Sequence, residues 1–168
     1  SCQSIHEGCE RMIIVEGSNK RNRDLVTEAA NFCAKELFPR HRAYTIYIDL
    51  VKKEKWEHNP LEYGVCFQGE DDRDIYIEIN TAKIKNNINE LLDTVCHEMI
   101  HVKQFLKKQI RDYIEPKYRM KWLCKDGKYR EYKNLPNHKL PWEVEAYKNS
   151  GKLLAKFKRE FYGYEGKA

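Results

Sequence analysis

Apolar residues in the first half of the chain recur with two spacings, one typical of strands and one typical of helices. Apolar and polar side chains alternate along residues 43–52 (AYTIYIDLVK), which predicts a half-buried strand. Over residues 23–38 the apolar positions lie three and four apart, which predicts a helix that ends before Pro39. Short β-branched or aromatic runs predict three more strands, at 11–16, 63–68 and 73–79. The last two runs flank an acidic turn and therefore predict a hairpin.

The second half of the chain contains two longer segments with helical spacing. Residues 87–110 keep their apolar positions in one stripe, and Asn87 stands three residues before Glu90, a spacing typical of a helix N-terminal cap. Residues 141–161 predict a last helix, because Pro141 is a favoured first helical residue. We therefore expect two helices that lie far apart in the sequence.

Between these helices, residues 121–132 (KWLCKDGKYREY) place an Asp-Gly pair between two aromatic-rich arms, which predicts a hairpin. The order of elements predicts one α+β domain over residues 1–168. Residues 11–79 would form a β-rich scaffold with one helix, and the sheet would be small and mixed or antiparallel.

Composition excludes several classes of protein, and charge divides the chain. With 34% charged residues, a mean hydropathy of −0.82 and no apolar run of about 20 residues, collagen, low-complexity disorder and membrane spans are poor fits. Residues 1–84 carry 12 Lys and Arg against 15 Asp and Glu, and residues 85–168 carry 19 against 11. The basic half interleaves aromatic residues with its cations, and we expect a solvated face of a monomer whose aromatic residues point inward. The alternative is weak contact with nucleic acid, whose backbone and bases such a pattern can also contact.

The six cysteines include no C-x-x-C pair, so they predict neither a zinc ribbon nor a redox motif. Cys33, Cys66 and Cys96 fall inside predicted elements, where a thiol acts as a small apolar residue. We therefore expect free thiols and a cytoplasmic location. If the protein is instead secreted after processing, Cys2 and Cys9 are the expected disulfide pair.

The stripe of residues 87–110 contains the motif His97-Glu98-Met99-Ile100-His101, an H-E-x-x-H sequence. Residues four apart are neighbours on a helix, so both imidazoles can face one ion while Val95 and Met99 face the core. Glu98 lies about 100° around the helix, where a carboxylate can act on a water held by Zn²⁺. This division of roles predicts hydrolysis. Two alternatives remain: a histidine pair without metal, and a structural metal without catalysis.

Two histidines leave a catalytic zinc site one protein ligand short. The metzincin pattern would require Gly and His where Gln104 and Lys107 stand, so that class is excluded. No histidine lies between His101 and His138, which argues against the SprT-like third ligand. A distant carboxylate and His138 remain as candidates.

The heptapeptide 141–147 (PWEVEAY) resembles the E-x-x-A or E-x-E-A signature of gluzincin-type metallopeptidases such as the HtpX-like and ImmA/IrrE-like proteins. In those families the first Glu of the signature is the third zinc ligand, so the resemblance implies that Glu143 has this role and that Ala146 lets the two helices approach. Residues 95–102 (VCHEMIHV) are also similar to the helix of the SprT-like family, which is linked to protein removal from DNA. The resemblance implies a zincin-like fold, in which the H-E-x-x-H helix packs on the sheet and the C-terminal helix supplies the third ligand.

Four further residues are candidates around this site. Tyr147 stands where the HtpX-like families have Asp, and its hydroxyl could stabilise an oxyanion; the alternative is a buried structural tyrosine. His138 is either a substrate or oxyanion contact or an exposed loop residue. Asp93, one turn before His97, could orient a ligand, and Glu145 is either a solvated charge or an acceptor behind the ligands.

Zincin folds generally bind extended substrate along an edge strand, which implies such a strand here. Residues 73–79 directly precede the motif helix and are the expected edge, where their acidic flank would favour basic peptides. The sequence thus predicts a zinc-dependent endopeptidase acting on a protein or peptide, with His97, His101 and Glu143 as ligands and Glu98 as general base. The alternative is a non-catalytic nucleic-acid- or protein-binding module with a structural metal.

Overall fold

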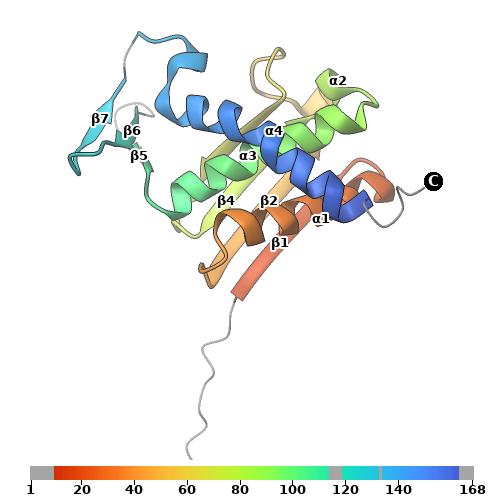
Figure 1. Cartoon of the computed structure of the whole chain (residues 1–168). Helices are drawn as coiled ribbons and strands as arrows, with labels where there is room; N and C mark the ends of the chain where they lie inside the picture. Colours follow the sequence, from red (N-terminus) through yellow and green to blue (C-terminus); the bar gives the residue numbers. More distant parts are fainter. Residues whose placement is uncertain (1–9, 114–118, 133, 163–168) are drawn as a thin grey trace, which may run out of the picture.

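The computed structural model describes residues 10–113, 119–132 and 134–162, which form a mixed α+β structure with two sheets and four helices (Figure 1). In chain order the elements are β1 (Glu10–Gly17), α1 (Lys20–Leu37), β2 (Ala43–Val51), the 3₁₀ turn η1 (Lys53–Lys55), β3 (Gly64–Gln68), β4 (Asp74–Asn80), α2 (Thr81–Ile84), α3 (Ile88–Leu106), β5 (Ile110–Tyr113), β6 (Arg119–Leu123), β7 (Tyr129–Glu131), the 3₁₀ turn η2 (Asn137–Lys139) and α4 (Pro141–Tyr162). The α+β class predicted from the sequence is confirmed.

The larger sheet has the strand order β1-β2-β4-β3 and is mixed. β1 pairs with β2 and β2 with β4 in parallel, whereas β3 and β4 form the expected antiparallel hairpin. The expectation that residues 73–79 form the edge of the sheet is wrong, because β4 lies between β2 and β3. Its inward side chains Ile75, Ile77 and Ile79 are at most 1% exposed, which suits a central strand. β3 is the edge strand on that side.

The helices cover one face of the larger sheet. In Figure 1, α1, α3 and α4 all lie in front of the strands, and α4 crosses α3 and α1. Along β2 the inward residues Tyr44, Ile46, Ile48 and Leu50 are buried, whereas the alternate residues from Ala43 to Asp49 are half-buried or exposed. The hydrophobic core therefore lies between the sheet and its helices, and the other face of the sheet is covered by no helix of the described chain.

Asparagine side chains fix where two of the helices begin. The side chain of Asn87 accepts a hydrogen bond from the backbone N–H of Glu90 (3.2 Å), which confirms the predicted cap of α3. Asn19 accepts from the N–H of Asn22 (2.9 Å), so α1 begins at Lys20, three residues earlier than its apolar spacing indicated.

The predicted end of the motif helix at residue 110 is wrong, because α3 ends at Leu106. Lys108 has a φ of 56°, and the N–H of Gln109 donates to the carbonyl of Gln104 (2.8 Å), which closes the helix. Ile110 is 2% exposed and begins β5, so its apolar character continued the helical spacing without belonging to the helix.

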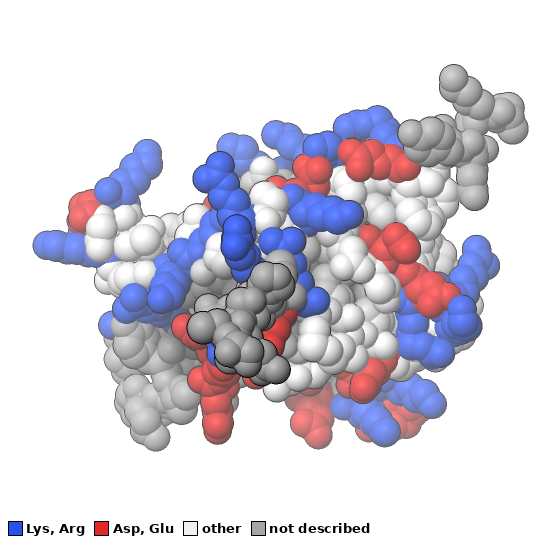
Figure 2. All heavy atoms as spheres, turned by 90° about the horizontal axis from the view of Figure 1, so that it is seen from below, with Lys and Arg blue, Asp and Glu red and all other residues white. Residues whose placement is uncertain are grey.

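The smaller sheet, of order β5-β6-β7, contains the predicted hairpin. Gly127 has a φ of 80° in the turn between β6 and β7, a conformation that glycine adopts readily. β5 was not predicted. Lys and Arg side chains project from the left-hand end of the molecule, where this sheet lies (Figure 2).

The sequence also predicted free thiols and no membrane span. Cys33 of α1 and Cys96 of α3 are buried with their Sγ atoms 3.8 Å apart, and Cys66 and Cys124 are half-buried. Cys2 and Cys9 lie outside the described residues. No described helix combines the length and the apolar character needed to cross a bilayer.

Candidate metal centre

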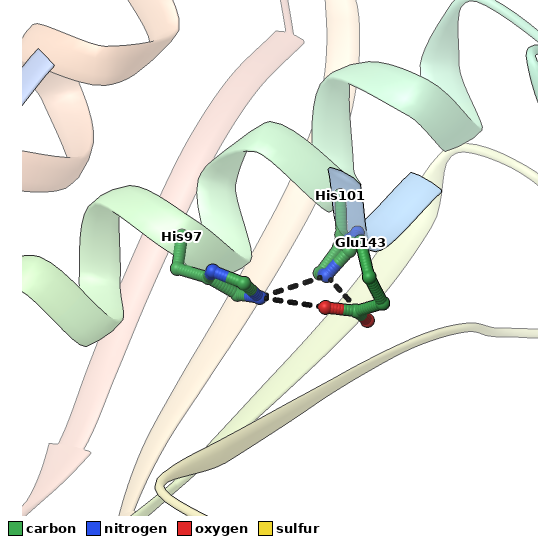
Figure 3. A group of neighbouring side chains, drawn as sticks. All are labelled: His97, His101 and Glu143. Atoms are coloured by element: carbon green, nitrogen blue, oxygen red, sulfur yellow. Dashed lines mark hydrogen bonds and ion pairs between the residues drawn. The ribbon is translucent and has the colours of Figure 1, made fainter. Parts of the chain in front are cut away.

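Three side chains from two helices meet at one point, His97 and His101 from α3 and Glu143 from α4 (Figure 3). The two histidine Nε2 atoms are 3.2 Å apart, and Glu143 Oε2 is 3.1 Å from His97 Nε2 and Oε1 3.1 Å from His101 Nε2. Two imidazoles and a carboxylate are the donor set of many catalytic zinc sites. The structure thus brings together the three residues that the sequence named as ligands, and the cluster could hold a metal ion.

The packing of α4 against α3 explains why the three side chains converge. His97 and His101 lie one turn apart, and Val95 and Met99 on the opposite side of α3 are fully buried, as predicted. Ala146 of α4 is also fully buried, so the two helices approach closely at this point. Glu143 lies in the first turn of α4 and is thereby directed at the histidines (Figure 3).

The cluster is largely removed from solvent, since the side chains of His97, His101 and Glu143 are 15%, 7% and 13% exposed. Burial alone would lower the pKa of His101, but the carboxylates of Glu143 and Glu98 outweigh it and raise that pKa to about 9. Burial likewise opposes ionisation of Glu143, but the two imidazoles outweigh it and lower the pKa of Glu143 to about 2. The surroundings therefore favour positive charge at the meeting point.

A buried glutamine holds His101 from behind. His101 Nδ1 lies 2.7 Å from Oε1 of Gln104, which is fully buried, and the Gln104 amide donates to the carbonyl of Trp142 (3.0 Å) and to Glu145 Oε1 (3.2 Å). A carboxamide oxygen can only accept, so Nδ1 carries a proton, and the proton that His101 would lose on binding a metal is the one on Nε2, the nitrogen that faces the cluster. The same side chain ties α3 to the first turn of α4.

Sequence reasoning missed this role of Gln104 and assigned the orienting role to Asp93 instead. Among the described residues, Gln104 is the orienting partner of His101, and no described contact joins Asp93 to the cluster. The spacing of three residues between His101 and Gln104 was the available signal. Glu145 accepts hydrogen bonds from Gln104 and Lys103, which corresponds to the acceptor alternative rather than to a solvated charge.

Glu98 is a buried carboxyl group with an unpaired oxygen. Glu98 is 4% exposed, and its Oε2 atom has no hydrogen-bond partner in the described structure. Burial raises the pKa of Glu98, with His101 and His97 opposing the shift. A Cβ atom on Gly64 of β3 would lie 3.2 Å from Glu98 Cγ and Oε1, so glycine permits the edge strand to approach this carboxyl group.

Tyr147 and His138 differ in their relation to the cluster. Tyr147 lies one turn after Glu143, its ring centroid is 4.7 Å from that of His97, and the residue is 58% exposed. The alternative of a buried structural tyrosine is therefore wrong. His138 is exposed in η2, and no described contact joins it to the three ligating side chains.

Comparison with known proteins adds no relative: no protein-family model, no curated protein and no solved structure matches this chain. The inference of function therefore depends on the residues of the cluster and on their geometry.

Proposed function

We propose that this protein is a zinc-dependent endopeptidase of the gluzincin type. The observation that carries the proposal is the convergence of His97, His101 and Glu143 next to a buried, unpaired Glu98. An unsatisfied buried carboxyl oxygen lowers folding stability by about 1–3 kcal/mol. A site that only binds a structural metal does not require such a group.

The residues of the chain fit this chemistry in named roles. His97, His101 and Glu143 would hold Zn²⁺, which when bound polarises a carbonyl group and acidifies water. Glu98 would accept a proton from the attacking water and deliver it to the leaving amine, and its burial raises its pKa toward the working range of a general base. The Tyr147 hydroxyl is the proposed oxyanion donor, and His138 is a proposed substrate contact. The exposed edge of β3 would pair with an extended peptide.

The decisive experiment is the Glu98→Gln substitution. We expect the variant to keep one zinc per chain and its folded circular dichroism spectrum but to lose about 10²–10⁴-fold in cleavage of a fluorogenic peptide library. Glu160→Gln, on the exposed side of α4, is the matched control and should cleave like the parent. Unchanged cleavage in Glu98→Gln would exclude this mechanism.

A second experiment assigns the ligands. Glu143→Ala should lower zinc content as His97→Ala does, whereas His138→Ala should leave it stoichiometric, as measured by elemental analysis after dialysis. Retention of a full zinc equivalent by Glu143→Ala would contradict the ligand set.

The alternative from another class is a binding module with a structural metal, in which Glu98→Gln changes nothing measurable. The cationic smaller sheet is the feature that supports nucleic-acid contact. Such binding would weaken steeply with salt because counterions are released. An absence of binding to a DNA duplex at low salt would remove this alternative. The cytoplasmic location and the monomeric state stay predictions.

A further inference from the structure

The face of the larger sheet that turns away from the helices carries a row of one aliphatic and three aromatic side chains. We call it the aromatic row, and its members are Ile14, Tyr47, Tyr76 and Phe67. These residues are paired in register across β1, β2, β4 and β3, so one continuous line of side chains crosses all four strands. The rings of Tyr47 and Tyr76 stack at 4.9 Å, and those of Tyr76 and Phe67 at 5.4 Å, with planes within 11°. Because the rings stack on one another, their edges face outward.

No helix of the described chain covers this row. Tyr47 and Tyr76 are only half-buried, and Phe67 at the edge is 37% exposed. Sheet faces of this kind are normally covered, and a contiguous apolar patch on a surface marks a contact site. The row lies on the far side of the sheet from α3, so it does not belong to the metal centre.

An acidic row, defined as Glu16, Asp49 and Glu78, runs beside the aromatic row. These three residues are also in register across β1, β2 and β4, two positions further along each strand. Carboxylates directly opposite one another on neighbouring strands repel, and burial together with Glu78 and Glu16 raises the pKa of Asp49.

The chain neutralises this row only in part. His58 Nε2 lies 2.6 Å from Glu78 Oε2, and Lys55 acts on Asp49 from a greater distance. Within the described ranges, neither Glu16 nor Asp49 takes part in an ion pair. The row also does not form a metal site, because the only described group of ligand atoms that converges within 4.8 Å is the one around His97.

We propose that this face docks a Lys- and Arg-rich segment of a partner protein. The aliphatic stems of such side chains would lie across the aromatic row, and their cationic ends would reach the acidic row. Charge complementarity selects a basic peptide, since an acidic peptide or a nucleic acid would be repelled by Glu16 and Asp49. The acidic flank of β4 would thus bind basic peptides on the sheet face opposite the helices, and not at the metal centre.

The test uses fluorescence anisotropy of a labelled decapeptide of alternating Arg, Ala and Lys, with an acidic decapeptide of equal length for comparison. The double variant Glu16→Gln/Asp49→Asn should weaken binding of the basic peptide about fivefold in 0.1 M salt, the loss of two exposed ion pairs. Tyr47→Thr, on the central strand β2, should weaken it without any change of charge. The control Glu28→Gln/Glu160→Gln makes the same change of net charge on the helical side and should shift the dissociation constant by less than about twofold.

Three results would overturn the proposal: equal weakening in both double variants, equal binding of the acidic peptide, or a dimer in sedimentation velocity that Glu16→Gln/Asp49→Asn dissociates. The last result would assign the face to a second copy of the chain. Zinc content and peptide cleavage are measured in parallel and should not change in any of these variants, so failure here is separable from failure of the proposed peptidase function.

Discussion

Among single residues, Gln104 has a positioning role that no sequence motif indicates. Its side-chain oxygen holds His101 and its amide holds the start of α4, so one side chain positions ligands from both helices. Gln104→Met removes these hydrogen bonds at similar volume, and we expect zinc affinity to fall about 10–100-fold with the fold retained. Competition with a zinc-chelating dye measures the change. Gln109→Met, which removes an amide whose Oε1 has no described partner, is the control and should bind zinc normally.

Glu98, the proposed general base, is expected to reduce the stability of the folded chain. Burial raises its pKa above the ordinary value of 4.5, so the ionised form is less favourable in the folded than in the unfolded chain. The stability that protonated Glu98 contributes is retained below pH 4.5 and is lost as the pH rises through the pKa of Glu98 in the folded chain. We therefore expect Glu98→Gln to raise the free energy of unfolding at pH 7 by about 1 kcal/mol, with a smaller difference at pH 4. Urea unfolding of the metal-free protein checks this; a less stable variant would contradict it.

The contrast between these two residues shows what can be predicted from sequence at this scale. Glu98 belongs to a local motif whose spacing alone places both histidines on one side of a helix. The amide partners of Gln104 lie 38 and 41 residues further along the chain, in α4. Contacts of that kind depend on how two helices pack, and no local pattern encodes them.

At the scale of elements, the contact between β3 and α3 determines how close the edge strand comes to the carboxyl group of Glu98. A Cβ on Gly64 would lie 3.0 Å from Thr94 Cγ2 and 3.2 Å from Glu98, so in Gly64→Ala the side chains of α3 or the strand must shift by a few tenths of an ångström. We expect a loss of about 1–3 kcal/mol in stability and slower peptide cleavage with zinc content unchanged.

Gly151→Ala is the matched control for Gly64→Ala. Gly151 lies inside α4, where an added Cβ meets nothing within 4 Å. This variant should be more stable by up to about 1 kcal/mol, because alanine favours the helix. Thermal unfolding and cleavage assays on both variants distinguish the contact at Gly64 from a general effect of added methyl groups. Equal behaviour of the two variants would exclude the close approach.

Elements themselves followed from the sequence more readily than their arrangement did. The spacing of apolar residues located the four strands of the larger sheet and the three long helices to within about four residues, and the Asp-Gly turn located the hairpin, whereas the short helix α2 was not predicted. It did not reveal that β4 is central and β3 the edge, because strand order depends on which neighbours bury the most surface. β5 was missed because its first residue, Ile110, prolonged the apolar stripe of α3.

For the whole molecule, hydrophobic packing joins the two helices that carry the candidate metal site. Along α4, Trp142, Ala146, Leu153 and Phe157 are buried, and the Phe157 ring lies 5.4 Å from that of Phe32 on α1. This core continues far beyond the first turn that contains Glu143. The cluster is therefore already formed in the folded chain, in contrast to small domains that fold only around a metal.

Removal of zinc should consequently lower stability without unfolding the protein. A ligand present at 100 times its dissociation constant adds about 2.7 kcal/mol, which for a domain of this size corresponds to a Tm higher by roughly 5–11 °C. We expect chelation by EDTA to lower the Tm by that amount while the far-ultraviolet circular dichroism at 25 °C stays the same. Glu143→Ala is the control, because its Tm should respond far less to zinc or to EDTA. A chelated protein that loses its helical signal would show instead that the ion holds α4 in place, and the preformed cluster would then be wrong.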